Sequence, residues 1–176
     1  MKYRSLTYAI PTLFALSATT ALPVHADVLS ADLSGFDEVP TLSSPASADF
    51  RARINKDETE IQYELKYSGF ETDVLQAHLH FGRPAISAGI MVFLCSNLGN
   101  GPAGTPACPK SPGTVTGTLR AGDVVGPAAQ GIAPGEFAEV IRAIRNGAAY
   151  ANVHSQAFST GEVRGQVKDF FFHDKD

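Results

Sequence analysis

Two stretches that alternate as β-strands do constrain this chain more than any other feature, because together they place three histidines on strand faces. In residues 76–82, alanine, leucine and phenylalanine alternate with His78 and His80. In residues 149–154, alanine and valine alternate with polar side chains that end in His154. Successive side chains of a strand point to opposite faces of a sheet. The pattern predicts two strands whose apolar side chains line the core and whose histidines share the opposite face.

The first 26 residues have the pattern of a secretory signal peptide. Lys2 and Arg4 form a positive start, an apolar run covers residues 6–22, and small residues at positions 24 and 26 suit a cleavage site. A membrane anchor is the alternative, but Pro11 and several hydroxyl side chains dilute the run. We predict a signal peptide over 1–26 and a periplasmic or secreted protein.

Cleavage would leave one domain over residues 27–169 and a short tail over 170–176. Without Lys2 and Arg4, 12 of the 14 basic residues remain against 18 acidic ones, a net charge of −6 with histidine neutral. An acidic chain without basic clusters disfavours nucleic acid as a partner, and no later segment is apolar enough to enter a bilayer. A metal ion, a protein partner or a second copy joined at an open sheet edge remain as partners.

Two cysteines, Cys95 and Cys108, flank a loop rich in glycine, proline and asparagine. Oxidising compartments favour pairing, so we predict a disulfide that ties down this loop. Thiolate metal ligation is the alternative, but the two residues lack the close Cys-x-x-Cys spacing typical of soft metal sites.

Short strands separated by turn residues recur along the whole mature chain, with a single amphipathic helix near the end. They predict an all-β fold, an antiparallel Greek-key β-sandwich with one short helix. The strands are expected at 28–33, 46–54, 59–67, the stretch that carries His78 and His80, 89–95, 113–120, 148–154 and 162–168, and the helix at 134–146.

A His-x-His pair on one strand and a third histidine on a distant strand can close around one transition-metal ion. We therefore predict a metal site formed by His78, His80 and His154. Copper is the first choice, because three imidazoles without a carboxylate suit it in an extracytoplasmic protein, and zinc is the second. The alternative is a set of solvated histidines on the outer face of a sheet.

Five segments, taken in order, resemble the CHRD domain family, named from chordin. They are Glu-Val-Pro at 38–40, Ala-His-Leu-His-Phe-Gly at 77–82, Ile-Arg-Asn-Gly at 144–147, Tyr-Ala-Asn-Val-His-Ser at 150–155 and Gly-Glu-Val-Arg-Gly-Gln-Val at 161–167. The resemblance implies an extracellular or periplasmic module spanning about residues 28–168. A shorter similarity, through residues 78–80 and 161–167, links the chain to the copper-zinc superoxide dismutases, which are also immunoglobulin-like sandwiches. Because the later zinc ligands of that family are missing, a mononuclear site is expected.

Side chains near the histidines are candidates for supporting the metal ligands. Asn152 would orient a ligand or bound water, and Glu162 or Arg164 would fix an imidazole tautomer. A surface ion pair between Glu162 and Arg164 is the alternative. Glu38, in a motif turn, is interpreted as an acceptor of backbone hydrogen bonds.

Three functions remain open at the level of sequence. The first is an extracytoplasmic copper-binding protein that handles the ion or reacts with small oxidants, with catalysis undecided. The second is a metal-independent module that binds a protein partner through its sheet face and the cysteine loop. The third is a redox enzyme of the superoxide dismutase kind. No serine–histidine–aspartate pattern, phosphate-binding glycine loop or catalytic carboxylate pair supports a hydrolase or a nucleotide-binding protein.

Overall fold

The computed structural model describes residues 27–170, so the expected signal peptide and residues 171–176 of the expected tail lie outside the described part. Strands dominate it. The elements in chain order are β1 (Val28–Ser34), η1 (Gly35–Asp37), β2 (Ser47–Ile54), β3 (Ile61–Ser68), β4 (Val74–Phe81), β5 (Ile90–Ser96), β6 (Gly113–Leu119), η2 (Ala121–Asp123), η3 (Ala128–Gln130), α1 (Phe137–Arg145), β7 (Ala149–Ser155), β8 (Val163–Gln166) and β9 (Lys168–Asp169).

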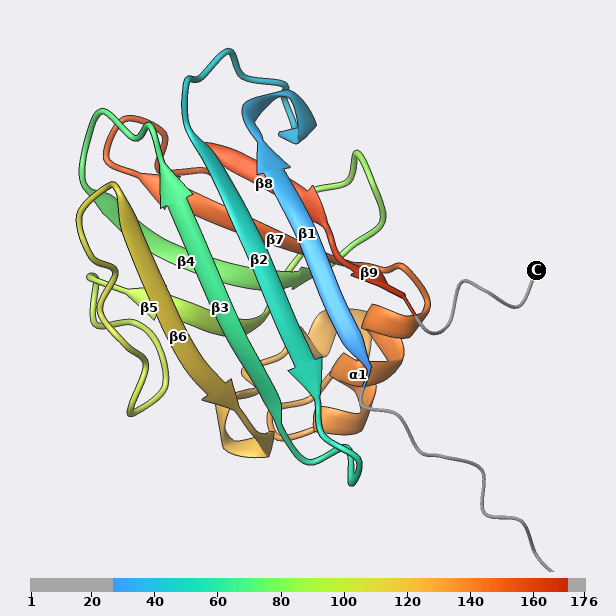
Figure 1. Ribbon diagram of the computed structural model, residues 1–176. Coiled ribbons are helices and arrows are strands. Elements are labelled where there is room, and N and C mark those ends of the chain that lie inside the picture. The colour runs from blue at the N-terminus through green and yellow to red at the C-terminus, as the bar shows by residue number, and fades with distance from the viewer. Residues whose placement is uncertain (1–26, 171–176) are drawn as a thin grey trace, which may run out of the picture.

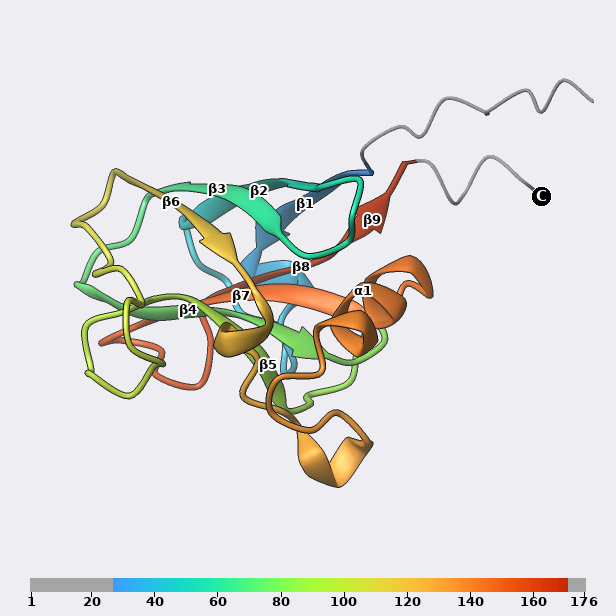
Figure 2. The same cartoon turned by 90° about the horizontal axis from the view of Figure 1, so that it is seen from below.

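The strands form a single antiparallel path that folds over on itself. Its order is β5-β4-β7-β8-β1-β2-β3-β6, and β9 pairs with β1. Seen along the sheet, β1, β2 and β3 make one layer, and β4 and β7 lie in the other (Figure 2). The two layers are joined where Ser34 of β1 pairs with Arg164 of β8. The all-β, antiparallel class with one short α-helix is confirmed.

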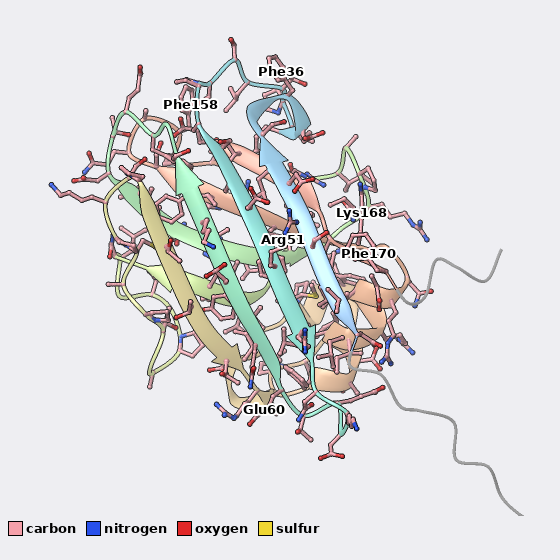
Figure 3. All side chains as sticks on the ribbon, in the orientation of Figure 1. Phe36, Arg51, Glu60, Phe158, Lys168 and Phe170 are labelled. Atoms are coloured by element: carbon pink, nitrogen blue, oxygen red, sulfur yellow. A yellow bond between two sulfur atoms is a disulfide. The ribbon has the colours of Figure 1, made fainter. Side chains whose placement is uncertain are left out.

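Alternation along β2 and β3 builds the layer that lies away from the histidines. Phe50 and Leu65 are paired across these strands and fully buried, whereas the neighbouring pair Arg51 and Glu64 faces outward. Arg51 can be seen on the outer face of the layer (Figure 3). From the other layer, Leu79 and Val153 are also fully buried. The core therefore lies between the layers, where burial of each large apolar side chain contributes about 1.5–3 kcal/mol.

Helix α1 lies at one end of the layers (Figure 1). Val140, Ile141 and Ile144 form its buried stripe, as the sequence pattern predicts. The helix begins three residues later than expected, because Gly135 adopts a positive φ of 87° and bonds the carbonyl of Val124 instead of extending the helix. Within the described range, no helix is long and apolar enough to cross a membrane.

The disulfide between Cys95 and Cys108 is confirmed, and it joins the end of β5 to the loop that follows. Asn97 adds hydrogen bonds to both the amide and the carbonyl of Cys108. The bonded residues are 13 apart in sequence.

Closure of a loop of that length should stabilise the fold by about 3 kcal/mol, mainly by restricting the unfolded chain. We expect the Cys95→Ala/Cys108→Ala double variant to lose about that much free energy of unfolding, measured by urea denaturation. Wild-type protein treated with a reductant should lose a similar amount. Equal stabilities of oxidised and reduced protein would contradict this estimate.

Candidate metal centre

The pairing of β4 with β7 brings the three predicted ligands onto one patch of sheet. In the antiparallel register, His78 lies opposite Asn152, and His154 lies opposite Gln76, two residues from His78. Diagonal neighbours of this kind are within reach of long side chains. His80 follows His78 on the same face, so the three imidazoles converge. We call His78, His80 and His154 the histidine cluster.

The histidine cluster is buried, with exposed fractions of 0%, 8% and 7% for His78, His80 and His154. The alternative of solvated histidines is therefore wrong. The physical reason is that the β4–β5 loop and the β7–β8 loop reach the outer face of the strands, and their carbonyls at Ala88 and Ser159 bond to His80 and His154. The result is a second, polar core on the side of the sheet away from the apolar one.

Hydrogen bonds fix which nitrogen atoms of His80 and His154 carry lone pairs. Nδ1 of His80 donates to the Ala88 carbonyl over 2.8 Å, and Nδ1 of His154 donates to the Ser159 carbonyl over 3.0 Å. Because a neutral imidazole carries one hydrogen, Nε2 of both rings must then be an acceptor. Carbonyl bonds to the second ring nitrogen are also what metal-ligating histidines usually have.

The ligand atoms of the cluster lie close enough to share an ion. One nitrogen of each ring falls within 4.8 Å of the others. In the metal-free chain Nδ1 of His78 donates to Nε2 of His154 over 3.2 Å, and an ion bound between these two atoms would replace that hydrogen. Metal–nitrogen bonds of about 2.0 Å in a tetrahedral arrangement separate two ligand atoms by about 3.3 Å. In addition, the Nε2 atoms of His78 and His80 are buried without a hydrogen-bond partner within residues 27–170. Buried polar atoms without partners are rare and costly, and a metal ion would satisfy the lone pair on His80.

Burial keeps the cluster neutral. Loss of hydration, followed by the nearby His154 and His80 rings, lowers the pKa of His78 to about 2. Loss of hydration lowers the pKa of His80 to about 4, although the bond to Ala88 acts in the opposite direction. The same cause lowers the pKa of His154. At neutral pH all three imidazoles are therefore uncharged, which is the form that binds metal ions.

A family comparison covers nearly the whole of this arrangement. The model of the CHRD domain matches residues 29–167, a range that contains the histidine cluster and both cysteines. The chain belongs to the CHRD domain family. No match was found among curated proteins or among solved structures. The similarity to superoxide dismutases stays a prediction.

The three predicted supporting residues of this CHRD domain are all buried, and in the described part of the chain none of their hydrogen bonds goes to an imidazole. Asn152 donates to the Glu38 carboxylate and to the Val163 carbonyl. Glu162 accepts a bond from a serine hydroxyl, and Arg164 donates to two loop carbonyls. With exposed fractions of 3% and 2%, Glu162 and Arg164 cannot form the surface ion pair that the sequence left open, so that alternative is wrong.

Sequence reasoning missed the residues that contact the ligands directly. Tyr150 stacks on His80, with ring centroids 4.7 Å apart and planes 4° apart. Its place on the histidine face was visible in the alternation, but nothing in the pattern gave it a role. Ala88 and Ser159 act through their carbonyls, so their side chains carry no signal.

Glu38 of the CHRD domain does accept a backbone bond, from Val39, as expected of a turn residue. It also accepts the bond from Asn152, and burial raises its pKa. A carboxyl group therefore lies next to the residue that faces His78 across the strands.

Proposed function

We propose that this CHRD-domain protein binds one transition-metal ion through His78, His80 and His154. One observation carries the proposal: three buried, neutral imidazoles converge, and the lone pair on Nε2 of His80 has no partner among the described residues. In a cluster built only for packing, burial of an unpaired polar atom would reduce stability without any compensating contact.

The donor set supports copper as the first choice and zinc as the second. Imidazole nitrogen binds both ions well, and the cluster contains no thiolate or carboxylate. The disulfide supports an oxidising environment, so we propose a periplasmic or secreted location. Copper bound there would supply one-electron chemistry.

The coordination number supports ion handling or chemistry with small oxidants. Three protein ligands leave one position for water or a small molecule. The slight exposure of His80 and His154 leaves little room for a bulky substrate at the ion. We propose that three buried residues support the site indirectly, because their hydrogen bonds fix the strands and loops that carry the ligands; they are Asn152, Glu162 and Arg164.

Elemental analysis of the mature protein tests this proposal, on material exported to an oxidising compartment and purified without a histidine tag. We expect close to one copper per chain, and nitrogen hyperfine structure in the electron paramagnetic resonance spectrum of the Cu(II) form. Absence of copper and zinc, even after both are offered and the excess is removed, would overturn the proposal.

Two other functions are distinguished from metal handling by metal retention and by superoxide turnover. A chain that retains no metal would be a metal-independent module that binds a protein partner or a second copy of itself. A superoxide dismutase activity ranks lowest, because the described residues offer three histidine ligands and no second metal cluster. That activity would require superoxide turnover by the copper-loaded protein above the rate of free copper at equal concentration.

A further inference from the structure

A stack of three side chains leads from β8 to the metal centre. The guanidinium carbon of Arg164 lies 3.5 Å from the centroid of the Tyr150 ring. The other neighbour of Tyr150 is the His80 ring, in a nearly parallel stack. All three side chains are buried. Only the Tyr150 ring therefore separates the positive charge of Arg164 from the proposed ligand His80, in a region from which water is largely excluded.

The same residues also hold the loop that fixes His80 from its other side. Arg164 donates to the carbonyl of Ile86 over 2.9 Å and to the carbonyl of Arg83 over 3.0 Å. Tyr150 accepts a bond from the amide of Ala88 over 3.1 Å. The Ala88 carbonyl accepts the hydrogen bond from Nδ1 of His80. The His80 ring is therefore held both by stacking on Tyr150 and by a loop that Arg164 anchors.

We propose that Arg164 is a positioning residue of the metal centre, which fixes His80 through Tyr150 and the β4–β5 loop and biases the centre towards Cu(I) over Cu(II). This inference rests on the proposed function. Three neutral imidazoles bring no negative charge to the ion, so a buried guanidinium disfavours the doubly charged form more than the singly charged one. The Glu38 carboxylate, which interacts electrostatically with Arg164, acts in the opposite sense and offsets a part of this effect.

Two variants separate geometry from charge. Arg164→Lys keeps the charge but loses the planar group that stacks and bonds two carbonyls, whereas Arg164→Met loses both. We expect the affinity for both copper ions to fall about tenfold or more in each variant, as on loss of other residues that orient metal ligands. The ratio of Cu(I) to Cu(II) affinity should fall about tenfold in Arg164→Met alone. A tenfold fall in the ratio of Cu(I) to Cu(II) affinity lowers the reduction potential of the bound ion by about 59 mV.

The matched control is Arg83→Met, which removes an exposed guanidinium from the same loop. Its charge is screened by water, so we expect wild-type affinity and an unchanged ratio. Affinities are measured by competition with chelators specific for each oxidation state. Urea denaturation of every metal-free variant checks that it folds.

A measurement on the metal-free protein keeps the positioning role testable without any ion. The exchange rate of the Nδ1 hydrogen of His80, followed by nuclear magnetic resonance, should be low in the wild type and in Arg83→Met. It should rise at least tenfold in both Arg164 variants, because the loop carbonyl that protects the hydrogen is released.

If the wild type binds no metal but the exchange rate rises in the Arg164 variants, the proposed function and the copper bias fail and the positioning of His80 stands. If Arg164→Met and Arg164→Lys keep wild-type exchange and affinity, the positioning role is overturned. If Arg164→Met keeps the wild-type Cu(I) to Cu(II) ratio, the effect of charge is overturned.

Discussion

Copper or zinc should raise the free energy of unfolding of this protein by about 4 kcal/mol when the free ion is 1,000-fold above its dissociation constant. His154→Gln should remove that gain. The reason is that Nε2 of His154 lies beside Nδ1 of His78 at the spacing of two ligand atoms, and a glutamine amide is a poor ligand for either ion. The measurement is urea denaturation with and without the ion.

A control must separate loss of the site from loss of stability in general. Tyr63→Phe serves, because its hydroxyl donates to the carbonyl of Leu94 in the apolar core, so the variant should be less stable yet keep the full gain from metal. An equal gain in His154→Gln and in wild type would show that the ion acts elsewhere on the chain.

The fold of this CHRD domain follows from local sequence to a large extent. The alternation of apolar and polar residues predicted β2 and β3, because each strand has one buried and one solvent-exposed face. The apolar stripe that contains Val140 and Ile144 predicted α1. Element ends were less accurate. The late start of α1 depends on a bond between Gly135 and the distant Val124, which no local pattern contains.

The sequence predicted the three ligands of the candidate site but not the residues that surround them. The period of two places His78 and His80 on one face whatever the tertiary structure, and the same alternation in residues 149–154 added His154. Burial of that face was not predictable, because the loops that cover it are fixed by long-range contacts such as Arg164 to Ile86. For the same reason the bond from Asn152 to Glu38, 114 residues apart, was invisible in the sequence.

Acid should destabilise the metal-free protein steeply below pH 6.5. In the unfolded chain each histidine takes up a proton near pH 6.5, whereas the pKa values of about 2 for His78 and about 4 for His80 keep the folded rings neutral. The unfolded state then binds more protons, so stability falls as the pH falls. Between pH 8 and pH 5 these two groups should cost about 4 kcal/mol, and His154 adds to the loss in the same direction. The raised pKa of Glu38 offsets a part of it.

His80→Gln should recover about 2 kcal/mol of that loss, because glutamine does not titrate and its amide can still donate to the Ala88 carbonyl. Urea denaturation at several pH values measures both effects. Unlike stability, the metal affinity of the folded chain should change little between pH 7.5 and pH 5.5, because the folded rings are already neutral and have no protons to release. Calorimetric titrations in buffers of different ionisation enthalpy would detect released protons directly. Release of two or more protons per bound ion at pH 6 would show that the cluster is charged in the folded chain, and would contradict both the acid prediction and the neutral cluster on which the metal site depends.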